Sequence, residues 1–383
     1  MTDGMRFETR AIHSGQDPDP ATGAAVVPIY QTSTFVQDAV GAPRGFEYSR
    51  TDNPTRRALE TCIAALEGAS DAVSFGSGMA ALTTLGLTLR SGDRVLIPDD
   101  VYGGTYRLFD KVFASLGIAY EPVDMTDRDA IDRALEQGAA LVVVETPSNP
   151  LLKVCDIAAI AQKTRAAGAR LVVDNTFATP FLQQPLDLGA DAVWYSATKY
   201  LGGHSDLVAG VITTSDDELA VRLRFLQNAA GAIPGPFDSW LLLRGLKTLG
   251  VRMRAHSAGA DRIAHWLAQR DDVAAVHYPG LPQHPGHDLA TKQMAASGEP
   301  LYGGMVSFEL STEERALEVC ASTRLFFLGE SLGGVESLIE HPYRMTHASL
   351  AGSGMEVPAG LIRLSVGIEH PDDLIDDLER ALA

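Results

Sequence analysis

The pattern of apolar and polar positions changes near residue 50. Residues 1–48 show no strong periodicity and contain four prolines, which predicts an extended arm of the kind that embraces a neighbouring subunit. From residue 53 the sequence NPTRRALETCIAALEGA repeats apolar residues at helical spacing after an Asn-Pro start. This start is typical of a capped amphipathic helix.

Short apolar runs then alternate with helical patterns. The runs are rich in β-branched residues and apolar at nearly every position, and they cover residues 71–75, 94–98, 141–145, 170–174 and 192–196. Continuously apolar strands separated by helical segments favour a parallel sheet that is covered on both faces. We therefore predict one α/β domain over residues 49–243.

The C-terminal third follows another pattern. A long helical segment covers residues 241–270, and strand-like runs follow at 303–310 and 361–369 with helical patterns between and after them. This order predicts a smaller α+β domain over residues 244–383. A chain of 383 residues is also longer than a single hydrophobic core usually supports.

Charge and composition narrow the function. The net charge of −18 argues against nucleic acid or an anionic membrane as partner, because both require a basic surface. The three cysteines are widely spaced and show neither metal-ligand nor disulfide-framework spacing, so we expect a reducing compartment and no metal. No apolar signal core and no run of roughly 18 apolar residues is present, which predicts a cytoplasmic location.

Chemically capable residues follow several of the predicted strands. A glycine turn ending in Gly78 and Met79 leads into a helix and suits a phosphate, although a plain strand–helix turn needs glycine as well. Tyr102 lies in a glycine-flanked loop, where its ring either stacks on a flat ligand or is simply a surface aromatic. Asp174 ends an apolar strand, where it either caps a helix or holds a protonated ring nitrogen. Lys199 follows another strand, where it is either a buried nucleophile or a cation that reaches into solvent.

The four features together describe one ligand. Pyridoxal 5′-phosphate needs a phosphate turn, a stacking ring, a carboxylate at its ring nitrogen and a lysine that forms a Schiff base with its aldehyde. The hydroxyl groups of Ser196 and Thr198 flank the lysine and can donate to the phosphate. Lys199 is therefore interpreted as the Schiff-base lysine.

At this point the chain resembles the Cys/Met-metabolism family of fold-type I pyridoxal-phosphate enzymes, the trans-sulfuration enzymes. The resemblance covers essentially the whole chain, and the most specific segment is YSATKYLGGHSD at 195–206. The other matching segments are 46–56, 76–81, 99–107, 145–150, 172–177, 241–249, 330–338, 345–349 and 362–369. The resemblance implies the aspartate-aminotransferase-like fold, with a mostly parallel seven-stranded sheet and a smaller C-terminal domain.

The resemblance also implies roles for individual residues. Lys199, Asp174 and Tyr102 match the catalytic lysine, the partner of the ring nitrogen and the stacking residue. The remaining matches to cofactor contacts are Gly78, Met79, Thr176, Ser196 and Thr198, with Tyr48 and Arg50 reaching in from the neighbouring subunit. The family further implies a homotetramer built from two active dimers, with small amino acids as substrates.

Arg363 lies in an otherwise apolar strand. A buried arginine requires a carboxylate partner, which is either an internal salt bridge or the α-carboxylate of a substrate. The resemblance favours the substrate, with Asn149 and Ser337 as companions. Further matches line the far end of the substrate, where charged groups suit cystathionine, and these are Glu47, Arg107 and Glu336.

Three local features favour cystathionine γ-lyase within the family. They are Glu47, the segment 222–238 and the residues 340–342. Cystathionine γ-synthase, which joins cysteine to an O-succinyl- or O-acetyl-homoserine, remains the alternative because it shares these features. Methionine γ-lyase fits less well, since the loop after Tyr102 has no cysteine. Cystathionine β-lyase fits the far-end residues less well, and a non-catalytic pyridoxal-phosphate regulator is disfavoured by the complete set of catalytic residues.

Overall fold

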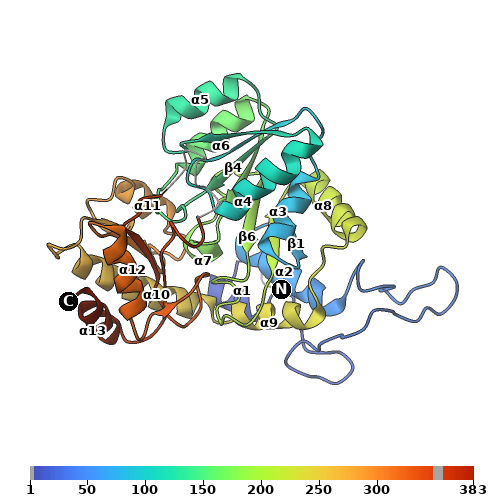
Figure 1. Cartoon of the computed structure of the whole chain (residues 1–383). Helices are drawn as coiled ribbons and strands as arrows, with labels where there is room; N and C mark the ends of the chain where they lie inside the picture. The colour runs from blue at the N-terminus through green and yellow to red at the C-terminus, as the bar shows by residue number, and fades with distance from the viewer. Residues whose placement is uncertain (1–3, 348–356) are drawn as a thin grey trace.

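The computed structural model describes residues 4–347 and 357–383, and it has two sheets with their own cores (Figure 1). The larger sheet has the order β1-β7-β6-β5-β4-β2-β3. Its strands are β1 Asp71–Phe75, β2 Arg94–Pro98, β3 Ala119–Val123, β4 Leu141–Glu145, β5 Arg170–Asp174, β6 Ala192–Ser196 and β7 Gly210–Thr214. Only β7 runs antiparallel to its neighbours, so the predicted fold, a mostly parallel seven-stranded sheet, is confirmed.

Two of these strands were not among the predicted runs. Edge strand β3 has the sequence AYEPV, is partly exposed and lacks a continuous apolar pattern. Strand β7 is fully buried, but its sequence GVITT is only half apolar. Pairing with neighbouring strands, rather than the local sequence pattern, makes both segments strands.

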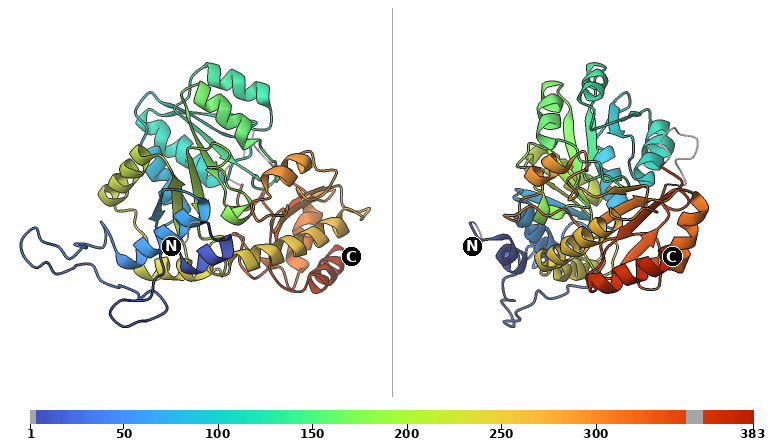
Figure 2. Two further views of the ribbon diagram at one scale, coloured as in Figure 1. Left: turned by 180° about the vertical axis from the view of Figure 1, so that it is seen from behind. Right: turned by 90° about the vertical axis from the view of Figure 1, so that its left-hand side faces the viewer.

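Helices cover both faces of this sheet (Figure 2). One apolar core joins the sheet to α5 and α6, and two others join it to α2, α9, α3 and α8. The helical segments are α2 Pro54–Glu67, α3 Gly78–Gly86, α4 Gly103–Arg107, η1 Leu108–Phe113, η2 Ala114–Leu116, α5 Arg128–Glu136, α6 Ile157–Ala166, α7 Thr179–Leu182, α8 Asp217–Ala230 and α9 Pro236–Leu246. The predicted Asn-Pro start is present, because Asn53 accepts the backbone N–H of Thr55 at 2.9 Å.

The smaller sheet has the order β10-β11-β12-β9-β8 and a separate apolar core. Its strands are β8 Ala275–His277, β9 Met305–Glu309, β10 Phe327–Leu328, β11 Leu338–Glu340 and β12 Leu361–Ser365. The helices of this region are α10 Leu249–Leu267, α11 His287–Gln293, α12 Glu313–Ser322 and α13 Pro371–Leu382. The expected domain boundary at 243/244 falls inside α9 and stays a prediction.

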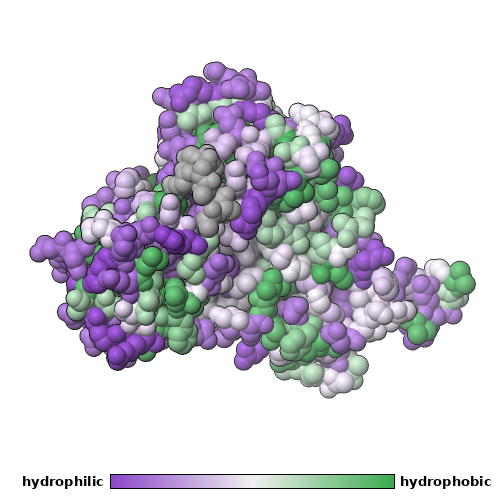
Figure 3. All heavy atoms as spheres, in the orientation of Figure 1, coloured by the Kyte–Doolittle hydropathy of each residue, from purple (hydrophilic) through white to green (hydrophobic). Residues whose placement is uncertain are grey.

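The first 48 residues divide into two parts. Helix α1, Phe7–His13, was not predicted, and it packs on the body through buried Ala11 and through Phe7, whose ring lies 5.0 Å from that of Phe181. The chain that follows, through residue 48, is mostly exposed and projects from the body in long loops (Figures 1 and 2). Apolar surface lies at the far end of this projection (Figure 3).

Across the described part of the chain, no helix is both long enough and apolar enough to cross a membrane.

Candidate active site

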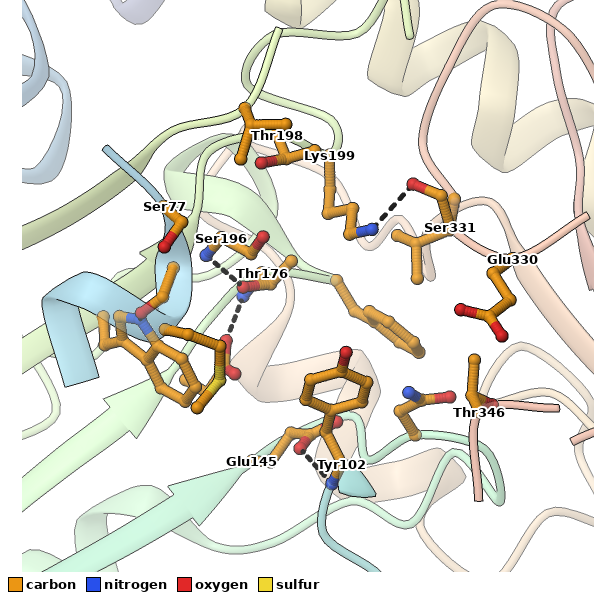
Figure 4. Close-up of a pocket in the computed structure, with 18 of the residues that line it drawn as sticks. Ser77, Tyr102, Glu145, Thr176, Ser196, Thr198, Lys199, Glu330, Ser331 and Thr346 are labelled. Atoms are coloured by element: carbon orange, nitrogen blue, oxygen red, sulfur yellow. Dashed lines mark hydrogen bonds between the residues drawn. The ribbon is translucent and has the colours of Figure 1, made fainter. Parts of the chain in front are cut away.

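A cavity of about 280 Å³ lies where the two regions of the molecule meet (Figure 4). One wall is formed by the carboxyl ends of β4, β5 and β6, which end at Glu145, Asp174 and Ser196. Parallel strands end at the same edge of their sheet, which is why residues distant in sequence converge there. The opposite wall comes from residues 330–332, Thr346 and Arg363.

The start of α3 forms a phosphate-sized corner of the cavity. The hydroxyl of Ser77 accepts the N–H of Ala80 at 3.0 Å, while the first N–H groups of the helix have no partner within it. A Cβ on Gly78 would come within 2.9 Å of Cβ of Ser196, so only glycine permits this approach. Met79, Ser196 and Thr198 line the cavity here, and the arrangement suits a phosphate.

Asp174 provides a test of whether a protonated heterocycle fits. Its carboxylate is 7% exposed and accepts the N–H of Thr176 at 3.0 Å, and the Thr176 hydroxyl accepts the N–H of Ser196 at 2.9 Å. Burial raises the pKa of Asp174 to about 6. No ion pair to Asp174 occurs among residues 4–347 and 357–383, so a protonated pyridine nitrogen would supply the missing cation.

Tyr102 lies immediately before α4, and its ring borders the cavity. A Cβ on Gly104 would lie only 2.4 Å from Cε1 of this ring, so glycine at 104 makes room for the tyrosine. The backbone N–H of Tyr102 donates to the carboxyl group of Glu145 at 3.4 Å. The ring is thus held where a flat ligand can stack on it.

Lys199 occupies the turn after β6, with its side chain in the cavity. Its Nζ donates to the hydroxyl of Ser331 at 2.6 Å (Figure 4). Burial, helped by the positive charge of Arg363, lowers the pKa of Lys199 to about 8. An amine with such a pKa is neutral far more often than a solvated lysine, which suits nucleophilic attack and proton transfer.

Arg363 lies in the centre of β12 and is 2% exposed. It forms an ion pair with Glu340 at 3.0 Å and donates to the side-chain oxygen of Asn149 at 2.8 Å and to the carbonyl of Ser331 at 2.7 Å. An internal salt bridge therefore exists, and Arg363 also lines the cavity, where its role toward a substrate carboxylate stays a prediction.

Two residues predicted to contact the substrate, Ser337 and Glu336, do not line the cavity. Ser337 does not line the cavity; its hydroxyl donates to Glu369 at 2.8 Å and accepts the N–H of Gly367 at 2.8 Å. Glu336 lies near Ser205, whose hydroxyl is 3.4 Å from its carboxylate. Ser331, rather than Ser337, contacts both Arg363 and Lys199, and the role of Ser337 beside Arg363 stays a prediction.

The remaining predicted contacts are exposed in a single chain. Arg50 donates to the carbonyl of Asn228 at 2.6 Å, and its guanidinium lies 5.6 Å from the ring centre of Tyr48. Glu47 and Arg107 are exposed as well. None of the four lines the cavity, so their roles stay predictions. The motif 345–349 ends outside the described residues.

Three carboxyl groups near the cavity were missed, namely Glu145, Glu330 and Glu340. Glu145 follows the same signal as Asp174, a carboxylate at the end of a buried strand, and that signal could have found it. Ser331 was missed as well, although it lies in the matching segment 330–338; its φ of +89° is unusual for a residue with a side chain.

Within the described residues, no group of three or more His, Cys, Asp and Glu side chains could hold a metal ion.

The chain can now be compared with known proteins. The family model "Cys/Met metabolism PLP-dependent enzyme" matches residues 8–383. A cystathionine gamma-synthase of Mycobacterium tuberculosis is 57% identical over 98% of this chain and 96% of its own length. A cystathionine beta-lyase of Lactococcus lactis is 52% identical over 98% of both chains.

Solved structures agree with this result. The crystal structure of metB from Corynebacterium glutamicum superposes with a TM-score of 0.97, at 49% identity and over 100% and 99% of the two chains. A cystathionine gamma-lyase from Lactobacillus plantarum superposes with a TM-score of 0.93 at 44% identity, over 98% of each chain. The resemblance, the fold class and the pyridoxal-phosphate cofactor are confirmed. The chain belongs to the Cys/Met metabolism family of pyridoxal-phosphate-dependent enzymes, and it is a trans-sulfuration enzyme.

Proposed function

We propose that the chain is a cystathionine γ-synthase, which replaces the γ-substituent of an O-acylated homoserine with the sulfur of cysteine. The main support for an amino-acid substrate is that Lys199 and Arg363 line the same cavity. Both side chains form hydrogen bonds with Ser331. The choice of reaction follows from the relatives, since identity is 57% to γ-synthases and 48% to a Bacillus subtilis cystathionine gamma-lyase.

Arg363 and Asn149 are proposed to bind the α-carboxylate of the amino acid. Charge-assisted hydrogen bonds from a planar guanidinium fix both position and orientation. This would direct the bond between Cα and its hydrogen toward Lys199, which lines the same cavity. The substrate carboxylate then joins Glu340 and Asn149 around one guanidinium.

Lys199 is proposed to take the proton from Cα at its Nζ, which a pKa of about 8 leaves neutral in an appreciable fraction near neutral pH. Bound pyridoxal phosphate supplies the electron sink that acidifies the substrate carbon–hydrogen bonds. Asp174 holds the positive charge of the cofactor ring, and Ser331 holds the lysine amine by accepting its hydrogen bond.

Cystathionine γ-lyase is the second candidate, and it is the reaction that the sequence features favoured. Glu47 and the residues 340–342 support it, and proteins of that name cover nearly the whole chain. The two reactions share their steps at Cα and differ in whether cysteine enters or leaves at Cγ. The similar proteins are themselves named as γ-synthases, β-lyases and γ-lyases.

Rates on separate substrates distinguish the two. Purified holoenzyme is given L-cystathionine alone, and in parallel O-succinyl- or O-acetyl-homoserine with cysteine. We expect cystathionine to form faster than 2-oxobutanoate is released from cystathionine. The reverse order establishes the lyase instead, and no turnover of any of these compounds refutes both. The Lys199→Ala variant serves as the inactive control.

A further inference from the structure

Two acidic residues end adjacent strands beside the cavity. Glu145 ends β4 and Asp174 ends β5, and the two are direct partners in the parallel register. Residues paired in this way project from the same face of a sheet, whose strands lie about 4.8 Å apart. Both side chains line the cavity, at 6% and 7% exposure.

No side chain of the described residues forms an ion pair with either carboxyl group. The cavity's two cations are engaged elsewhere, since Lys199 donates to Ser331 and Arg363 pairs with Glu340. A third acid, Asp100, lies close by, but it accepts the Ser148 hydroxyl and lies beside the Lys153 ammonium. A protonated ring nitrogen bound in this cavity would therefore have two buried carboxyl groups near it.

Two adjacent carboxylates in a dry site repel each other, so one of them retains a proton. Asp174 has the better donor, the Thr176 N–H at 3.0 Å, whereas Glu145 receives the Tyr102 N–H at 3.4 Å. The hydrogen bond from Thr176 stabilises the ionised form of Asp174. Burial and then the charge of Asp174 raise the pKa of Glu145 well above its usual range.

We propose that Glu145 is a positioning residue that stays protonated at neutral pH beside the Asp174 carboxylate and accepts the Tyr102 N–H. In this role it leaves a single negative charge for the ring nitrogen and fixes the backbone of the stacking tyrosine. The proposal goes beyond the proposed function, because it holds equally for replacement and elimination.

Infrared spectroscopy tests the proton directly. Wild-type protein carrying ¹³C-labelled glutamate is compared with unlabelled protein at pH 7, with and without cofactor. We expect a label-sensitive stretching band of a buried protonated carboxyl group, and we expect Glu145→Gln to lack it. Wild-type protein without such a band overturns the proposal. This measurement needs neither substrate nor turnover, so it is independent of the reaction catalysed.

Kinetics provide the matched test. Glu145→Gln stays neutral but alters the acceptor of the Tyr102 N–H, so kcat/KM should fall by about 3- to 10-fold, whereas Asp174→Asn should lose about 100-fold. The pH titration of the bound cofactor's absorption should likewise change in Asp174→Asn and not in Glu145→Gln. A Glu145→Gln enzyme as impaired as Asp174→Asn overturns the proposal. Burial raises the pKa of Glu67 to about 8, so this residue can give a similar band. If Glu145→Gln does not fold, Glu67→Gln replaces it: a band that persists in that variant supports the proposal, and its complete loss overturns it.

Discussion

The cavity and the N-terminal arm differ in what holds their side chains in place. Asp174, Lys199 and Arg363 are buried or nearly so, and each has partners within the chain. Tyr48 and Arg50 are exposed on a loop with little core beneath them. One chain thus builds a defined cavity, whereas Tyr48 and Arg50 do not line it.

The largest expected effect is at Lys199. Lys199→Ala should lower turnover at least 1,000-fold, because no other amine lines the cavity formed by the described residues, and general-base catalysis contributes about 10²–10⁴-fold. The rate of product formation measures this loss. Cofactor should still bind without a covalent bond, which absorption after gel filtration reports. Near-normal turnover would refute the assignment.

Arg363 should have the next largest effect. Arg363→Ala removes charge-assisted hydrogen bonds worth about 1.5–3 kcal/mol each, so kcat/KM should fall about 100-fold, with KM raised and kcat lowered together. Arg363→Lys is the matched control; it keeps the charge but loses the planar fork and should recover only part of the activity. An unchanged KM in the alanine variant would exclude the carboxylate role.

The arm should show a smaller effect with a distinctive pattern. Arg50→Ala should weaken cofactor binding about 10-fold if its guanidinium reaches a phosphate. At a cofactor concentration that leaves the Arg50→Ala protein almost inactive, subunit exchange with the Lys199→Ala protein should restore about a quarter of wild-type activity, because half of the dimers then hold one intact site. Steady-state rates of the mixture measure this. A mixture no better than the average of the two variants shows that the arm does not serve a neighbour.

The smallest effect is a shift in titration. In cofactor-free protein, labelling of Lys199 by a small amine-reactive reagent should reach half its maximum near pH 8, since its pKa is lowered to about 8 and the amine is neutral above that value. Exposed Lys111, whose pKa is raised by Asp110, is the internal control and should label only at higher pH. Mass spectrometry separates the two sites. Parallel labelling curves would contradict the lowered pKa.

Local pattern predicted those parts of the molecule that have strong local causes. The five apolar runs became β1, β2, β4, β5 and β6, and the Asn53 cap began α2 as expected. Helix α1 was missed because a single buried residue, Ala11, leaves no periodicity to detect. Edge strand β3 was missed for the related reason that half its positions face outward.

The residues of the site also fall into a group that the sequence predicted and a group that it did not. Lys199, Asp174 and Tyr102 each follow a recognisable segment, so the sequence by itself determined the cofactor, the family and the residues at the strand ends. Tertiary structure decided which side chains face one another across the cavity, because contacts between distant segments depend on how the two sheets pack. It placed Ser331 beside Arg363 and Lys199, paired Ser337 with Glu369, and placed Glu340 on Arg363. It also set Glu145 beside Asp174, because that pairing depends on strand register, which the strand sequences alone do not specify.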